Sequence, residues 1–216
     1  MAERLLKNMT TLNLQREIRR KAFHMLAGLT VPFLYYGAFL LENTTGKPYT
    51  YLAKWILLAA AAATLALDIT RLRHQFIKII FIDIFGPLLR RHEIDALTGA
   101  TYLMLSSLAC IVLFQPFIAM AAICFLVIGD ALAAMVGRNL GKTKFFLKSF
   151  EGTVAGFAGC LMIGTALIFL PHSDLSLSRM VIGAAVAMIV ELLPIPLDDN
   201  IRVPLAAGAV MQWLVH

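Results

Sequence analysis

Asp130 is the residue whose surroundings point most clearly to chemistry. It is the single charged residue in the apolar run from Pro116 to Gly137. A carboxylate at the centre of a bilayer costs about 2.5–3.5 kcal/mol on insertion scales, so a chain retains one where it faces protein, water or a metal. A segment rich in glycine and basic residues follows, from Gly137 to Lys144. An acid beside a basic, glycine-rich segment suggests a site for a metal ion and phosphate.

The glycine-rich segment is not a Walker motif. That motif has four residues between its glycines and follows a strand, whereas three residues separate Gly137 from Gly141 and an apolar run precedes them. Glycines nevertheless let backbone amides approach phosphate, and basic side chains neutralise it. The candidate ligand-binding residues are Gly137, Arg138, Gly141, Lys142, Thr143, Lys144, Lys148, Ser149 and Gly152. An alternative explains the segment equally well: its basic residues could simply mark the cytoplasmic side of the membrane and bind no ligand.

A helix is expected to begin just after this segment. Ser149 can cap its first turn, which contains Glu151, and the N-terminus of a helix attracts anions. Alternatively, Ser149 is an ordinary helix cap and the helix N-terminus binds no ligand.

Acidic residues lie at the ends of several apolar segments. They are Asp68, Glu93, Asp95, Glu151, Glu191, Asp198 and Asp199. Mg²⁺ commonly takes one or two carboxylates and completes its shell with phosphate oxygens and water. We take Asp130, Asp198 and Asp199 as candidate metal ligands, because Asp130 lies deep and the other two form an acidic turn. Asp68 is explained more simply as an ion-pair partner of Arg71 or Arg73.

A basic cluster precedes the first apolar run. Arg19, Arg20 and Lys21 could bind lipid headgroups, which is the common case at a membrane boundary, or nucleotide phosphate. His24 can share a helix face with Lys21, because it lies three positions after Lys21 in the chain. A lone histidine at an interface is usually structural, so we do not assign it as a base.

The composition indicates that these residues are positioned by a membrane domain. The 216 residues are 60% hydrophobic with a mean hydropathy of +0.80, which soluble domains rarely reach. Cys110, Cys124 and Cys160 all lie in apolar segments, which suggests small core residues and neither disulfides nor metal ligands. We predict one all-α, polytopic integral membrane domain over residues 1–216, without a nucleic-acid partner. A homodimer is left open.

About seven apolar segments could cross the bilayer. They are predicted near 25–41, 52–67, 96–114, 116–137, 152–170, 175–193 and 203–215, the last being short. The uncharged stretch 96–129 would be about 51 Å long as one helix, so we divide it at Gln115-Pro116. Residues 1–21 are expected to form a charged, amphipathic helix on the membrane surface. Residues 74–89 are expected to form an interfacial or re-entrant element.

The basic residues predict the orientation of this domain. If the N-terminus is cytoplasmic, every lysine and arginine lies on the cytoplasmic side except Lys47, Lys54 and Arg179. This distribution follows the positive-inside rule. Almost all candidate polar residues then lie on the side of the membrane where nucleotides are found.

Three blocks of sequence resemble the membrane CTP-dependent lipid kinases, which include dolichol kinase, phytol kinase and the yeast-type diacylglycerol kinase. The blocks are Glu17–His24, Gly129–Lys144 and Lys148–Thr153. Residues 90–101 and 197–200 fit the same family less distinctively. The resemblance covers most of this chain, but only the C-terminal catalytic part of the larger dolichol kinases.

The resemblance implies phosphoryl transfer from CTP to the hydroxyl group of a polyprenol or dolichol, a phytol-like alcohol or diacylglycerol. Arg20, Lys21, Asp130 and Gly137 match positions that the family needs for activity, and residues 142–152 match its proposed CTP-binding loop.

The expected reaction takes place at the cytoplasmic face. Asp130 with Asp198 or Asp199 would hold Mg²⁺ and the nucleotide phosphates. Basic side chains would neutralise the transferring group, and these are Arg138, Lys142, Lys144 and Lys148. Arg20 and Lys21 would close the site. The general base remains open among Asp130, Asp199 and Glu151.

Two other functions fit part of the sequence. The middle block is shared loosely with phosphatidate cytidylyltransferases, but the C-terminal signature of those enzymes is missing from the apolar residues 204–216. A small transporter could also carry an intramembrane acid, but the chain shows no inverted repeat and its polar residues gather on one side. The membrane would be the cell (inner) membrane in a prokaryote and of endoplasmic reticulum type in a eukaryote.

Overall fold

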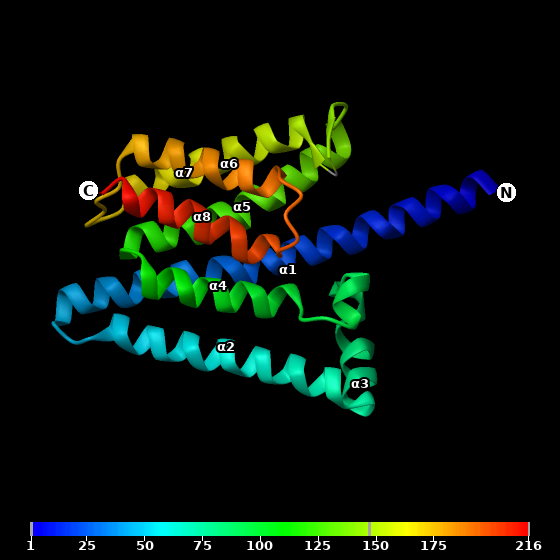
Figure 1. The fold of residues 1–216 in the computed structure, drawn as a ribbon, viewed down its shortest axis with the longest axis horizontal. Helices are drawn as coiled ribbons and strands as arrows, with labels where there is room; N and C mark the ends of the chain where they lie inside the picture. The colour runs from blue at the N-terminus through cyan, green and yellow to red at the C-terminus, as the bar shows by residue number, and fades with distance from the viewer. Residues whose placement is uncertain (1, 147, 216) are drawn as a thin grey trace.

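Helices form nearly all of the described chain. The computed structural model describes the backbone of residues 2–146 and 148–215 and the side chains of residues 19–146 and 148–215. In chain order, the elements are α1 (Ala2–Thr45), α2 (Tyr49–Arg73), α3 (Gln75–Phe85), η1 (Gly86–Leu88), η2 (Arg91–Ile94), α4 (Gly99–Leu113), α5 (Pro116–Leu140), β1 (Lys144–Phe145), β2 (Lys148–Ser149), α6 (Phe150–Ile168), α7 (Leu177–Leu192) and α8 (Asp199–Trp213). The long helices lie side by side and alternate in direction along the chain (Figure 1).

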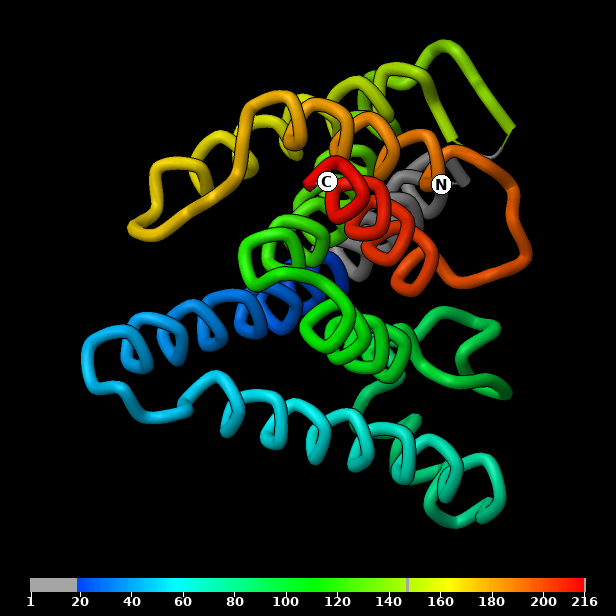
Figure 2. The backbone as a smooth tube through the Cα atoms, turned by 60° about the vertical axis from the view of Figure 1, so that its left-hand side comes forward, coloured from blue at the N-terminus to red at the C-terminus, as the bar shows by residue number. Residues whose placement is uncertain are grey.

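Helix α5 forms the centre of the bundle. It contacts α1, α4, α6, α7 and α8, and its side chains from Phe117 to Val127 are all buried. A helix that is apolar on every side is expected in such a position. The segments α1–α2 and α6–α7 lie on opposite sides of α4, α5 and α8 (Figure 2).

Glycines allow α5 and α6 to pack closely. A Cβ atom on Gly152 would lie 2.6 Å from the carbonyl oxygen of Ala133, and one on Gly156 would lie 2.9 Å from that of Gly129. Both distances are shorter than a normal contact. Small residues in membrane helices allow this kind of backbone approach, and here they bring the first turn of α6 against the last turns of α5.

Four helices are long and apolar enough to cross a bilayer among the described residues. They are Arg19–Thr45 within α1, α2, α5 and α6. Helices α4, α7 and α8 have 15, 16 and 15 residues, fewer than the about 20 that usually span a bilayer. The all-helical membrane architecture therefore agrees with the sequence prediction, whereas the number of seven spans is not confirmed.

Three local features differ from the prediction. Helix α1 continues without a break through residues 21–25, where a surface helix was expected to give way to a span. The charged side chains before Arg19 lie outside the described residues. Helix α5 continues to Leu140, beyond the predicted end of this span at Gly137, so Arg138 is also helical. The segment after it forms a two-stranded antiparallel hairpin in which Lys144 pairs with Ser149.

Helix α3 lies across the end of α2 (Figure 1). Its exposed side chains include the apolar residues Phe76, Ile79, Ile80 and Ile84. A short helix with such a surface is suited to the membrane interface. Residues 74–89 thus form a short helix followed by a 3-10 turn, and their interfacial or re-entrant placement stays a prediction.

Candidate active site

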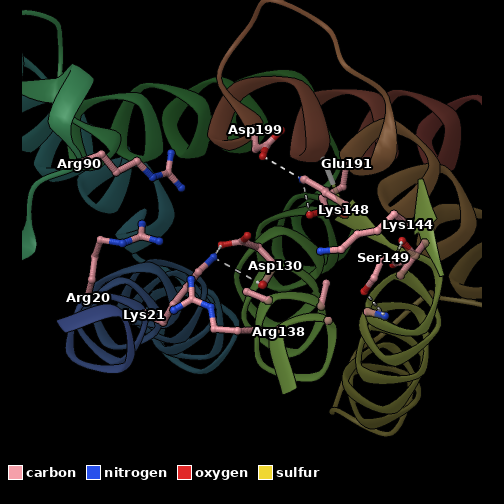
Figure 3. A pocket seen from close by; sticks show the side chains of 15 residues that line it. Arg20, Lys21, Arg90, Asp130, Arg138, Lys144, Lys148, Ser149, Glu191 and Asp199 are labelled. Carbon is pink, nitrogen blue, oxygen red and sulfur yellow. Dashed lines mark hydrogen bonds and ion pairs between the residues drawn. The ribbon is translucent and has the colours of Figure 1, made fainter. Parts of the chain in front are cut away.

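A cavity of about 340 Å³ lies at the end of the bundle where α5 ends and α6 begins. Its charged side chains come from seven different elements or connections, and they point towards one another (Figure 3). The basic ones are Arg20, Lys21, Arg90, Arg138, Lys144 and Lys148, and the acidic ones are Asp130, Glu191 and Asp199. Basic groups are in excess, and a concave surface with one dominant sign of charge attracts ligands of the opposite sign. The cavity is therefore suited to a polyanion.

Lys21 and Asp130 form an ion pair across the α1–α5 contact. The Lys21 Nζ donates to Asp130 Oδ2, and it lies 3.5 Å from the backbone carbonyl oxygen of Asp130. The two side chains are 8% and 15% exposed. Removing charges from water is costly, and close pairing offsets much of that cost. This pair explains how an apolar helix accommodates Asp130, although the residues are 109 positions apart.

Lys148 connects the hairpin to the last two helices. Its Nζ donates to Glu191 Oε1 on α7 and lies 3.1 Å from Asp199 Oδ2 on α8 (Figure 3). Asp199 also accepts a hydrogen bond of 2.8 Å from Arg202 Nε. The second carboxylate oxygen of Glu191, Oε2, is buried without a hydrogen-bond partner among the described residues. Glu191 therefore has capacity for another ligand at the cavity wall.

The hairpin is held to the first turn of α6 by its own polar groups. Ser149 Oγ accepts a hydrogen bond of 3.2 Å from the Gly152 amide, which makes Ser149 the predicted N-cap. The Glu151 carboxylate accepts a hydrogen bond of 3.0 Å from the Thr143 amide. Glu151 therefore helps to fix the conformation of the hairpin. Its carboxylate is engaged by the Thr143 amide and does not line the cavity.

The glycines next to the hairpin serve packing. A Cβ atom on Gly141 would lie 2.1 Å from the Gly137 carbonyl oxygen, and one on Gly137 would lie 2.7 Å from Ser149 Oγ. The Gly137 amide lies within α5 and belongs to the helix. We expected the backbone amides of these glycines to bind phosphate, but their observed role is in packing. Because they have no side chains, the hairpin can fold back onto α6.

The structure brings most, but not all, of the predicted site residues together. Those lining the cavity are Arg20, Lys21, Asp130, Gly137, Arg138, Lys144, Lys148, Ser149, Gly152 and Asp199. Those outside its wall are Gly141, Lys142, Thr143, Glu151 and Asp198. Asp198 caps α8 by accepting a hydrogen bond of 2.9 Å from the Asn200 amide.

Arg90 and Glu191 are cavity residues that the sequence did not assign to the site. The segment containing Arg90 matched the lipid kinases only weakly, and Glu191 was noted merely as an acid ending an apolar segment. Both sit at an end of an apolar segment, and this position was the available signal.

A buried network positions Arg90. Asp68 Oδ1 accepts a 2.6 Å hydrogen bond from Arg71 Nε, and Asp68 Oδ2 accepts one of 2.7 Å from the Thr98 amide. Arg71 is fully buried and also donates to the carbonyl oxygens of Glu93 and Ala96. The predicted pairing of Asp68 with a nearby arginine is therefore seen with Arg71, and the pair fixes the connection that leads from Arg90 to α4.

The acidic residues do not form a complete metal cage. Among the side chains that the structure describes, no group of three or more histidine, cysteine, aspartate and glutamate residues could hold a metal ion. Asp130, Asp199 and Glu191 nevertheless line one cavity, and each has a basic partner. This donor set fits Mg²⁺ only if phosphate oxygens and water supply the rest of its shell.

Several curated proteins are similar to this chain. An uncharacterized protein of Rickettsia prowazekii is 27% identical over 156 residues, which cover 70% of this chain and 76% of that protein. The CTP-dependent diacylglycerol kinase 1 of Saccharomyces cerevisiae is 27% identical over 146 residues, which cover 66% of this chain and 47% of that kinase. The chloroplastic phytol kinase 1 of Arabidopsis thaliana is 33% identical over 127 residues, which cover 52% of this chain and 42% of that kinase.

The chain thus spans less than half the length of the two named kinases. No protein-family model matches the sequence, and no solved structure matches it.

Proposed function

We propose that this chain, which belongs to the family of CTP-dependent lipid kinases represented by these relatives, transfers the terminal phosphoryl group of CTP to the hydroxyl group of a membrane lipid alcohol. The observation that carries the proposal is the basic cavity at one end of an apolar bundle. A nucleoside triphosphate is a polyanion that suits such a cavity. The name of the yeast relative supports CTP as the donor.

The basic side chains would perform most of the catalytic work. Phosphoryl transfer relies on positioning and on stabilising charge, because the protein has little covalent chemistry to perform. Lys144, Lys148 and Arg138 reach the cavity from the hairpin and the end of α5, and Arg20 and Arg90 from the opposite wall (Figure 3). Incoming phosphates would compete with Glu191 and Asp199 for Lys148, so the ion pairs would rearrange when nucleotide binds.

Asp130, Asp199 and Glu191 are the side chains that would hold Mg²⁺ together with the nucleotide. The ion would supply additional positive charge for the phosphates when it is bound. The Lys21–Asp130 pair would keep the Asp130 carboxylate oriented at the cavity wall.

We place this end of the bundle in the cytoplasm. The ends of α2, α5 and α7 and the starts of α4, α6 and α8 meet there (Figure 1). Most basic residues lie at the same end, which the positive-inside rule assigns to the cytoplasm. Seven spans would follow if the shorter helices α4, α7 and α8 also cross the membrane.

A donor competition assay tests this function. Purified full-length protein in lipid nanodiscs is supplied with Mg²⁺ and a polyprenol, phytol or diacylglycerol, and CTP and ATP labelled at the terminal phosphate are compared. We expect a phosphorylated lipid from CTP, and we expect unlabelled CTP to suppress it more than equal unlabelled ATP. Equal use of ATP would contradict the donor assignment. Absence of phosphorylated product from every alcohol and donor would contradict the kinase.

A further inference from the structure

A second cavity, of about 260 Å³, adjoins the basic one. The two cavities share Arg20, Arg90 and Asp130 in their walls. Most of the remaining wall of the second cavity is apolar, and its side chains include Phe23, Leu67, Phe81, Phe85, Leu88 and Leu103. An apolar cavity that meets a polyanion site at a common acidic residue is a suitable place for the second reactant.

The apolar wall extends onto the outside of the bundle. Phe23 on α1, Leu67 on α2 and Phe85 at the end of α3 line the cavity, and they are also 52%, 45% and 37% exposed. These side chains would face lipid in a membrane protein, where exposed apolar residues are stable. An occupant with an apolar tail could therefore extend from the cavity directly into the bilayer.

His24 contributes a polar atom to this wall. Its Nε2 atom is buried and has no hydrogen-bond partner among the described residues. A buried polar atom without a partner costs about 1–3 kcal/mol, so a ligand that supplies the hydrogen bond would be favoured. His24 lies one helical turn after Lys21, which lines the basic cavity, and Asp130 lines both cavities. The imidazole is thus close to the junction of the two cavities.

The acids that the sequence offered as general bases are all engaged. Asp130 pairs with Lys21, and Asp199 pairs with Lys148 and Arg202. Glu151 accepts its hydrogen bond from Thr143 outside both cavities. The unpartnered nitrogen of His24 is better suited to accept a proton than any of these carboxylates.

We propose that the second cavity binds the acceptor as a long-chain alcohol, with its hydroxyl group on His24 Nε2 beside Asp130 and its tail in the bilayer. The hydroxyl oxygen forms a bond to the terminal phosphorus of CTP, and the bond from that phosphorus to the bridging oxygen breaks. The electron pair of the broken bond leaves on CDP, and the hydroxyl proton passes to His24 Nε2. This proposal rests on the proposed function for the donor, but its binding site can be tested without turnover.

Photo-crosslinking tests the binding site. A long-chain alcohol carrying a diazirine in its tail is irradiated with the full-length protein in nanodiscs, and the labelled peptides are identified by mass spectrometry. We expect labels on α1 and α2 around Ala27 and Leu67, and we expect unmodified alcohol to compete for them. An alkane of the same length should compete poorly because it lacks the hydroxyl group.

Two variants, each with phenylalanine in place of one alanine, provide a matched comparison. Ala27 lines the second cavity, so Ala27→Phe should fill the space and abolish these labels while CTP binding is unchanged. Ala63 is exposed on α2, next to the cavity residue Thr64, and Ala63→Phe should leave labelling and activity unchanged. Labels elsewhere, or labels that persist in Ala27→Phe, would overturn the assignment of this cavity to the alcohol.

His24→Gln tests the role of the imidazole. Glutamine can still hydrogen bond, but it cannot take the proton, and positioned acid–base groups contribute about 10²–10⁴-fold to rate. We therefore expect kcat to fall by about this factor, with unchanged affinity for CTP and retained labelling by the photoreactive alcohol. Wild-type kcat in His24→Gln would overturn the proposed role.

These outcomes separate the two proposals. Alcohol labelling at Ala27 and Leu67 without phosphoryl transfer by the wild-type protein would refute the kinase and keep the binding site. Phosphoryl transfer with labels elsewhere would refute the binding site and keep the kinase.

Discussion

Replacement of Asp130 by asparagine is expected to lower kcat by at least about 100-fold, the usual scale for loss of one charge-stabilising or proton-handling group. Asp130 lines both cavities and accepts a hydrogen bond from Lys21. Asparagine has nearly the same shape and can still accept that bond, so the fold should survive. It has no charge, however, and cannot help to hold a divalent cation with the nucleotide phosphates. Steady-state kinetics of the purified variant with CTP and a lipid alcohol measures the effect.

Asp174→Asn is the matched control for this substitution. Asp174 is exposed in the connection between α6 and α7, at the opposite end of the bundle from the basic cavity. Its removal should leave kcat unchanged. Near-wild-type kcat in Asp130→Asn, with folded protein in the membrane, would refute the assignment of the reaction to the junction of the two cavities.

Arg71→Met is expected to lower the free energy of unfolding by about 3–5 kcal/mol, because it leaves a buried carboxylate without its charge partner. Arg71 donates to Asp68 and to three backbone carbonyl groups before α4, and its guanidinium lies 4.7 Å from the centre of the Phe81 ring. Methionine fills much of the same volume but replaces none of these hydrogen bonds. Activity should also decline, because the connection that carries Arg90 is no longer fixed.

Arg73→Met serves as the comparison for Arg71→Met. Arg73 belongs to the same last turn of α2 but is exposed. Denaturant unfolding of both variants in the same detergent should show a large loss of stability for Arg71→Met and almost none for Arg73→Met. Equal midpoints for the two variants would show that the buried network contributes little to the fold.

The long uncharged apolar runs of the sequence were sufficient to predict an all-helical architecture with helices that are long and apolar enough to cross a membrane. Asp130 could be singled out because a lone carboxylate in an apolar helix needs a partner. The Lys21–Asp130 pair could not be derived in the same way. It depends on α1 packing against α5, and no local pattern encodes contacts between residues 109 positions apart.

The glycine-rich segment shows a preference that tertiary contacts override. Glycine is unfavourable in a helix by about 1 kcal/mol relative to alanine, yet Gly137 and the residues after it up to Leu140 are helical. The close approach of α6 reverses this preference, because any side chain at Gly137 would collide with Ser149. Glu151 likewise suggested chemistry by its type, whereas its position in the first turn of α6 brings it to the Thr143 amide.

Arg90 and Glu191 escaped the sequence analysis for a related reason. Each is an ordinary charged residue at an end of an apolar segment, and only the packed bundle shows which ends meet. His24 was discounted as a lone histidine. Its position in the wall of a cavity, with an unpartnered Nε2, is a property of the tertiary structure alone.

Position-specific labelling of CTP separates a lipid kinase from an enzyme that transfers the nucleotide. The full-length protein in nanodiscs is given Mg²⁺, a lipid alcohol and CTP that carries ³²P at either the α or the γ phosphorus. A lipid kinase should transfer the γ label to the lipid and leave the α label in CDP. Appearance of the α label in the lipid would show cytidylyl transfer and contradict the kinase. Absence of both labels from the lipid would also contradict the proposed reaction.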